Sequence, residues 1–144
     1  SESTSRKDID YTLRAIDDFF ADKMPSITMF SPRQANATLL MDKSTYILDV
    51  RSSGDRRSIN GLPGSHEASF YGIKKYLHAI PKDKLIIVVC QGGTNSPFTC
   101  YYLRSKGYRN TGFIMTGMYG WKAANREFYD QYCGQNIVRL EEKG

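Results

Sequence analysis

The sequence predicts an α/β fold: a mostly parallel central β-sheet flanked by helices on both faces. Two short, uniformly apolar segments, residues 46–50 and 85–89, have the composition of buried parallel strands. Segments with helical spacing or helix-start signals lie between these and the other predicted strands. Strands that alternate with helices are typical of βαβ units, whose strands run parallel.

The predicted elements follow one another along the chain. Residues 8–23 place Ile9, Leu13, Ile16 and Phe20 on one face of an amphipathic helix. The later elements are a strand at 27–30, a helix from Ser31-Pro32 to about 41, a strand at 46–50, a polar loop at 51–64, a helix at 71–80, a strand at 85–89, a helix at 97–105, a strand at 111–115 and a helix at 121–129. We therefore expect an N-terminal helical extension at residues 1–26, an α/β domain at residues 27–128 and a C-terminal tail at residues 129–144.

Composition excludes several classes of protein for this chain. The 144 residues, 40% of them hydrophobic, fit one domain. The formal net charge is +5, but no basic stripe or nucleic-acid motif accompanies it, so we expect no nucleic-acid partner. The longest apolar run is too short to span a membrane, and the first residues do not have the pattern of a signal peptide. The first residue is not methionine, so we expect a trimmed chain or part of a longer protein.

The three cysteines, Cys90, Cys100 and Cys133, suggest free thiols. An odd, sparse set argues against a disulfide framework and predicts an intracellular, reducing compartment. The cysteines and the two histidines show no zinc-type spacing, so no metal cofactor is expected.

The loop after the second apolar strand carries the strongest chemical signal. It reads Cys-Gln-Gly-Gly-Thr-Asn-Ser over residues 90–96, and Ser96-Pro97 predicts a helix start with Ser96 as the N-cap. Ligands of open α/β sheets bind at the carboxyl ends of strands, and a glycine-rich loop before a helix presents amide groups to anions. A cysteine beside such a loop gains thiolate character, so Cys90 is a predicted nucleophile. The alternative is a buried cysteine that simply ends the strand.

Three other loop types do not match. A phosphate-binding P-loop needs a Lys-Ser/Thr pair after its glycines, and none follows here. A phosphatase loop ends in an arginine, whereas Ser96 and Pro97 occupy that part of this loop. No Cys-x-x-Cys redox motif is present.

Five segments, in order, resemble those of a single-domain rhodanese, a member of a sulfurtransferase family. They are the strand that ends in Asp-Val-Arg (46–51), the Pro-Gly turn (61–65), the strand and active loop (85–96), the Gly-Tyr-Arg-Asn segment (107–110) and the closing Gly and Trp-Lys segment (117–122). The resemblance implies a sulfurtransferase that moves sulfane sulfur from a small anionic donor such as thiosulfate to a thiol or cyanide acceptor. Sulfur would pass through a persulfide on Cys90, without a cofactor.

The resemblance also implies a set of substrate-binding residues in the loop: Gln91, Gly92, Gly93, Thr94, Asn95 and Ser96. Two alternatives remain. One is a non-catalytic rhodanese-like interaction or regulatory module, with a protein partner on the N-terminal helix. The other is a phosphatase or arsenate reductase on the related fold, which the absent loop arginine disfavours.

The loop departs from the family because it holds no cation. Gln91 and Asn95 stand where arginine is frequent, and Gly61 where the turn often has histidine. Weak thiosulfate binding, or a preference for another donor, is therefore expected. We hypothesise that Arg56 or Arg57 reaches the anion site; the alternative is that both lie in a solvated charged loop. Asp49 and Arg51 are expected to form a mainly structural pair at the end of the strand, with Arg51 as a further candidate cation for the anion site.

Three further residues have weaker predictions. Cys100 is expected in the core, with a resolving thiol for Cys90 as the alternative. Tyr119 is a candidate pocket wall, and His66 follows the Pro-Gly turn and could approach the site.

Overall fold

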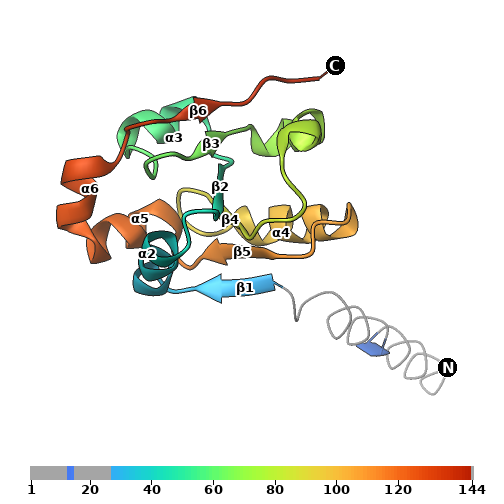
Figure 1. The fold of residues 1–144 in the computed structure, drawn as a ribbon, viewed down its shortest axis with the longest axis horizontal. Coiled ribbons are helices and arrows are strands. Elements are labelled where there is room, and N and C mark those ends of the chain that lie inside the picture. Colours follow the sequence, from blue (N-terminus) through green and yellow to red (C-terminus); the bar gives the residue numbers. More distant parts are fainter. Residues whose placement is uncertain (1–12, 15–26, 144) are drawn as a thin grey trace, which may run out of the picture.

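The structure is a computed structural model that describes residues 13–14 and 27–143. Its strands are β1 (Ile27–Phe30), β2 (Tyr46–Asp49), β3 (His66–Glu67), β4 (Ile86–Val89), β5 (Thr111–Ile114) and β6 (Val138–Arg139). Its helices are α2 (Pro32–Met41), α3 (Ser53–Ser58), the 3₁₀ helix η2 (Phe70–Ala79), α4 (Ser96–Ser105), α5 (Gly117–Ala124) and α6 (Arg126–Tyr132) (Figure 1).

The described strands form one sheet in the order β1-β5-β4-β2-β3-β6, and every pairing is parallel. The predicted apolar strands β2 and β4 lie side by side in its interior, and all of their residues are buried. This confirms the predicted α/β class. Asp49 of β2 pairs with Val89 of β4, so the loops that follow these two strands begin next to each other.

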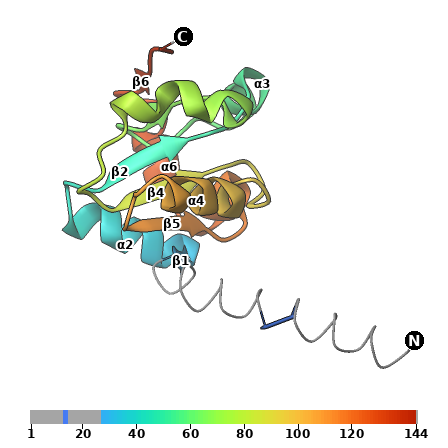
Figure 2. The same ribbon diagram turned by 90° about the vertical axis from the view of Figure 1, so that its right-hand side faces the viewer.

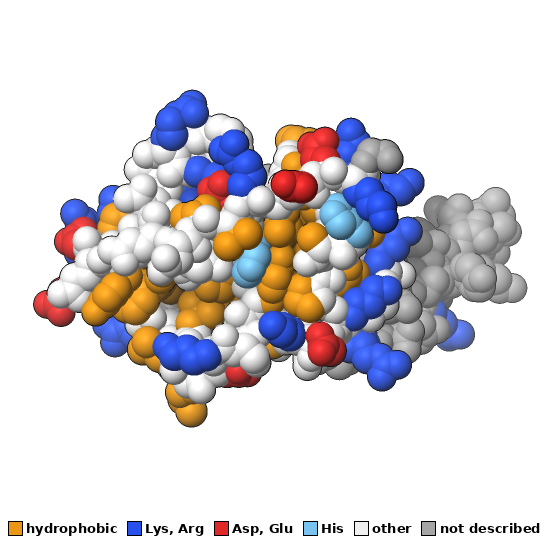
Figure 3. Space-filling view, turned by 45° about the horizontal axis from the view of Figure 1, so that its top comes forward, with side chains coloured by type: hydrophobic (Ala, Val, Ile, Leu, Met, Phe, Trp, Pro, Cys, Tyr) orange, Lys and Arg blue, Asp and Glu red, His pale blue; other side chains and the backbone are white. Residues whose placement is uncertain are grey.

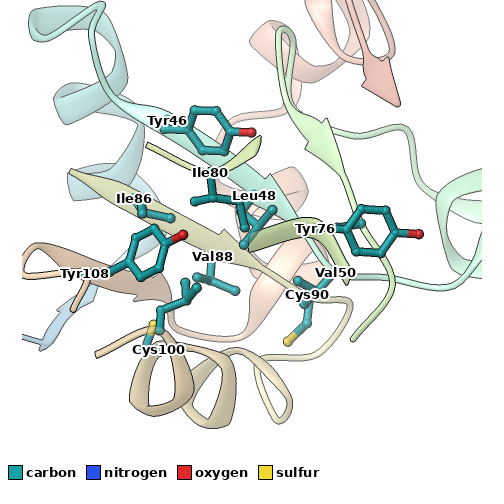
Figure 4. Close-up of a cluster of buried hydrophobic side chains, with 12 residues drawn as sticks. Tyr46, Leu48, Val50, Tyr76, Ile80, Ile86, Val88, Cys90, Cys100 and Tyr108 are labelled. Carbon is teal, nitrogen blue, oxygen red and sulfur yellow. The ribbon is translucent and has the colours of Figure 1, made fainter. Parts of the chain in front are cut away.

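Helices cover both faces of the sheet (Figures 1 and 2). On one face, α4 and η2 join the cluster around Leu48 and Val88, part of which is drawn in Figure 4. On the other face, α2, α5 and α6 join the cluster around Ile47 and Ile87. Successive residues of β2 and β4 thus point to opposite faces, which explains why both strands are apolar throughout.

The start of α2 is as predicted, whereas the start of α4 is one residue earlier. Ser31 caps α2 by accepting a hydrogen bond from the Gln34 backbone N–H at 3.2 Å, and Pro32 is the first helical residue. In α4 the N-cap is Asn95 rather than Ser96, and the Asn95 side chain makes no capping hydrogen bond.

Three other sequence predictions need correction. The loop at 51–64 contains α3, whose six residues include none that is buried, so no apolar periodicity marked it. The segment predicted as a helix at 71–80 is a 3₁₀ helix interrupted at Gly72. The helix predicted at 121–129 is two helices that meet at Asn125, whose φ of −129° is not helical.

The predicted C-terminal tail adds a strand to the sheet. Residues 138–139, in the predicted C-terminal tail, form β6 and pair with β3 at the sheet edge. The predicted N-terminal helix lies outside the described residues, except for 13–14, which are helical. In the part of the chain that the structure describes, no helix has the length and apolar character needed to cross a membrane.

Candidate active site

Cys90 lies at the carboxyl end of β4, where the loop to α4 begins. Its side chain is 3% exposed, and its Sγ accepts a hydrogen bond from the Gly93 backbone N–H at 3.1 Å. Gly93 has φ +91°, and a Cβ there would lie 2.9 Å from the Thr116 backbone nitrogen. The loop can therefore turn its amide toward the sulfur only with glycine at this position.

Two backbone hydrogen bonds join the start of α5 to the Cys90 loop. The Met118 N–H donates to the Cys90 carbonyl at 2.9 Å, and the Tyr119 N–H donates to the Gln91 carbonyl at 3.1 Å. In a trans peptide the N–H points away from the C=O, so the Gln91 and Gly92 amides face away from α5. No local pattern predicts this contact, and its one signal in the sequence is the glycine at the start of α5.

Arg51 is buried beneath the loop and is fully engaged. Its guanidinium forms an ion pair with Asp49, with 3.0 Å between Nη2 and Oδ2. Its Nη1 donates to the carbonyls of Asp55 and Ile59, at 3.2 and 2.8 Å, and to the Gln91 Oε1 at 2.7 Å. Arg51 therefore ties β2, α3 and the Cys90 loop together, and its ion pair with Asp49 is the structural pairing that the sequence predicted.

Gln91 continues this network to the surface. Its Oε1 accepts from Arg51, and its Nε2 donates to the Ser58 Oγ of α3 at 2.9 Å. We call these three side chains the Arg51–Gln91–Ser58 bridge. Both polar ends of the Gln91 side chain are hydrogen-bonded, so this residue supports the loop through its side chain.

A pocket of about 240 Å³ opens beside Cys90. It is lined by Val50, Arg51, Ser52, Asp55, Ser69, Phe70, Tyr71, Cys90, Gln91 and Asn95. Arg51 is the one cation in this lining, and Asp55 adds a carboxylate. The pocket thus brings together a thiol, an amide-bearing loop and an aromatic rim, with no free positive side chain.

The remaining predicted loop residues lie around the pocket rather than in its lining. Gly92 and Thr94 are exposed, and Gly93 acts through its amide. Ser96 is fully buried, and its hydroxyl has no hydrogen-bond partner among the described residues. The side chain of Tyr119 does not line the pocket, and His66 stacks on Tyr46 instead.

The structure does not bring Arg56 and Arg57 to the Cys90 pocket. The Arg56 Nη2 donates to the carbonyls of Asp49 and Ala68, and its Nε lies 3.4 Å from the Glu67 carboxylate. Both arginines line a separate pocket of about 220 Å³. The reason is α3: a helix turns about 100° per residue, so neighbouring residues face different sides.

Residues 32–124 match the model of the Rhodanese-like domain family. The chain belongs to this family. A curated relative, the adenylyltransferase and sulfurtransferase uba4 of Ogataea parapolymorpha, is 30% identical over 84 residues. That match covers 58% of this chain but only 21% of the relative, so the chain spans about a fifth of the relative's length.

Solved structures of similar fold support the same architecture. A rhodanese-like domain protein from Staphylococcus aureus is 23% identical with a TM-score of 0.60, and the match covers 65% of this chain and 90% of that one. An NAD-dependent persulfide reductase from A. fulgidus is 24% identical with a TM-score of 0.54, over 76% of this chain and 18% of that one. At these identities the likeness establishes the fold.

The other two cysteines of the chain lie in apolar surroundings. Cys100 is fully buried in α4, its thiol donates to the Gly112 carbonyl at 3.4 Å, and burial raises its pKa to about 12. The Cys90 and Cys100 sulfurs lie at separate places in the core cluster (Figure 4). This confirms the predicted core position of Cys100, and a thiol held in this way is poorly suited to resolve a persulfide on Cys90.

Cys133 follows α6 and is half-buried, outside the Cys90 pocket. Burial raises the pKa of its thiol to about 12 as well. Over the described residues, no group of three or more His, Cys, Asp or Glu side chains could hold a metal ion.

Proposed function

We propose that this rhodanese-like domain is a sulfurtransferase that carries sulfane sulfur as a persulfide on Cys90. One observation carries the proposal: Cys90 lines a pocket, and its Sγ accepts a hydrogen bond from the Gly93 amide. An N–H donor aimed at the Cys90 Sγ stabilises negative charge on the attacking sulfur. The start of α4 at the end of the same loop adds partial positive charge.

The first half-reaction loads the enzyme. The Cys90 thiolate attacks the outer sulfur of the donor, and a new S–S bond forms while the donor's S–S bond breaks. The electron pair of the broken bond leaves with the donor fragment, as sulfite from thiosulfate or as a thiolate from a persulfide. No external oxidant or reductant is needed.

The second half-reaction returns the enzyme to its starting state. A nucleophilic acceptor, such as cyanide or a thiolate, attacks the terminal sulfur of the Cys90 persulfide. The S–S bond breaks, its electron pair stays on the Cys90 Sγ, and the acceptor leaves with one sulfur atom. Two half-reactions of this kind give ping-pong kinetics.

Intact-mass measurement tests the proposal. The protein is incubated with thiosulfate, or separately with cysteine persulfide, and the mass is expected to rise by one sulfur atom that cyanide then removes. The Cys90→Ser variant should gain none, whereas Cys133→Ser, the matched control at a cysteine outside the pocket, should gain it as the wild type does. No sulfur on Cys90 from either donor would contradict the proposal and would favour a non-catalytic interaction module.

A further inference from the structure

Three arginines gather beside the Cys90 pocket without entering it. Arg56, Arg57 and Arg139, here called the arginine cluster, line one pocket together with Ser53 and Glu67. Glu67 pairs with Arg56. Arg57 and Arg139 are exposed, and neither forms an ion pair with another described residue. Basic side chains also gather on the side of the molecule where α3 lies (Figures 1 and 3).

The arginine cluster and Cys90 both lie at the carboxyl ends of the strands. Val89, Asp49, Glu67 and Arg139 lie in one row across β4, β2, β3 and β6. Neighbouring strands are about 4.8 Å apart, so three steps place Arg139 roughly 14 Å from the residue before Cys90.

Helix α3 forms the wall between the two pockets. Its N-cap Ser52 and its Asp55 line the Cys90 pocket. Ser53, Arg56 and Arg57 line the pocket of the arginine cluster. A ligand that binds both pockets must therefore reach across one short helix, which is the scale of a protein segment and larger than thiosulfate.

The Cys90 pocket offers a small anion no free cationic side chain. Its one cation, Arg51, is neutralised by Asp49 and bound to the Gln91 side chain. Its rim includes Phe70 and Tyr71, and Tyr71 is 93% exposed. Exposed aromatic side chains beside a site are typical of contacts with protein. Acidic side chains of a substrate are thus favoured at the arginine cluster, because the Cys90 pocket offers them backbone amides but no free cationic side chain.

We infer that the sulfur donor is a cysteine persulfide on a protein whose acidic segment binds the arginine cluster. This inference rests on the proposed function. The acidic side chains of the donor pair with Arg57 and Arg139 while its persulfide passes Tyr71 to Cys90. The Cys90 thiolate takes the terminal sulfur, the donor's S–S bond breaks, and the donor cysteine leaves as a thiolate with the electron pair.

Synthetic peptides of known charge test the inference on the full chain. One peptide carries a cysteine persulfide with glutamates starting about four residues away, the number that spans roughly 14 Å in extended chain. A second peptide has glutamine in place of each glutamate. The rate of sulfur transfer to Cys90, followed by intact mass at low salt, should be about tenfold higher for the acidic peptide, and added salt should remove the difference.

Charge reversal locates the effect. The double variant Arg57→Glu/Arg139→Glu should lower the rate with the acidic peptide to that of the neutral one or below it, because the introduced glutamates repel the acidic segment. Urea unfolding checks that the variant is folded. Arg109→Glu is the matched control, because this exposed arginine precedes the amino end of β5, whereas the arginine cluster lies at the carboxyl ends of β3 and β6.

The outcomes separate the inference from the proposed function. Equal wild-type rates with the two peptides, or an equal loss in Arg109→Glu, would overturn the inference while the sulfurtransferase activity stands. Failure of Cys90 to accept sulfur from both peptides, thiosulfate and cysteine persulfide would overturn the proposed function itself.

Discussion

Gly93 and Gly117 shape the loop around Cys90 from its two sides. Gly93 turns its amide toward the sulfur, and Gly117 lets α5 approach the loop carbonyls. Gly117 has φ +58°, and a Cβ there would overlap the Cys90 carbonyl oxygen and lie 2.6 Å from the Gln91 oxygen. Close backbone contact, in addition to the left-handed conformation, therefore requires glycine at position 117.

Gly117→Ala should lower both stability and sulfur transfer. The left-handed conformation alone costs a residue with a Cβ about 1–2 kcal/mol, and the contact with the loop adds to this cost and displaces the Cys90 carbonyl. The control is Gly64→Ala, because Gly64 has φ +74° but no atom within 4 Å of the place that a Cβ would take. Urea unfolding and the rate of persulfide formation measure the two effects; equal losses in both variants would contradict the loop contact.

At the scale of elements, the Arg51–Gln91–Ser58 bridge fixes the Cys90 loop to its neighbours. Arg51 follows β2, Gln91 follows β4 and Ser58 ends α3. The buried Asp49 holds the guanidinium in place. Gln91 stands where arginine is frequent in this family, and here its side chain braces the loop.

Gln91→Met should slow persulfide formation more than Ser58→Ala does. Methionine has a similar length but leaves the Arg51 Nη1 without one of its acceptors, at a cost of about 1–3 kcal/mol. Ser58→Ala removes only the hydrogen bond at the exposed end of the bridge. Urea unfolding and the sulfur-loading rate of each variant measure this difference; a Gln91→Met protein that loads sulfur at the wild-type rate would contradict a bracing role.

His66 in β3 should make stability depend on pH. Its ring stacks on Tyr46 with 3.8 Å between centroids, and burial lowers its pKa from 6.5. The unfolded chain therefore takes up the proton first, and stability is lost as pH falls below about 6.5 until the folded histidine also protonates.

Urea unfolding between about pH 7.5 and 5.5 checks the His66 prediction. The wild type should lose stability over this range, whereas His66→Phe should lose less, because its ring stays neutral. His78→Gln, at the other histidine of the chain, should behave as the wild type does. A His66→Phe profile parallel to that of the wild type would assign the effect to other groups.

At the scale of the whole molecule, two hydrophobic clusters lie on opposite faces of the sheet that carries the site. The cluster that holds Trp121 packs α5 against β2 and β4, and the same helix supports the Cys90 loop through its first amides. Trp121 is fully buried and meets Phe128 edge-on with 5.4 Å between centroids. Packing in this core and the geometry of the site are therefore coupled through α5.

Trp121→Ala should destabilise the fold by about 3–5 kcal/mol, because it leaves a large cavity between α5 and the sheet. The rate of sulfur loading of the remaining folded protein should also fall, because a displaced α5 supports the Cys90 loop less well. Trp121→Phe, which keeps an aromatic ring, should retain more of both. Thermal unfolding together with intact-mass loading gives the comparison, and full activity in Trp121→Ala would separate the core from the site.

Local patterns were sufficient to predict much of the fold and the centre of the candidate site. The apolar strands at 46–50 and 85–89 and the Ser31-Pro32 helix start have signals within a few residues, and so does the Cys90 loop. Helix α3 was missed because none of its residues is buried, and the break at Asn125 because it depends on how α5 and α6 pack.

The sequence by itself determined the α/β class and singled out the loop with Cys90 as its candidate nucleophile, because each depends on the order of neighbouring residues. The tertiary structure decided what each arginine does. Arg51 is bound beneath the loop, while α3 turns Arg56 and Arg57 to the pocket that Arg139 shares. That grouping depends on the register of the strands and on the rotation of α3, which bring together residues far apart in the chain. Patterns among neighbouring residues therefore cannot predict it.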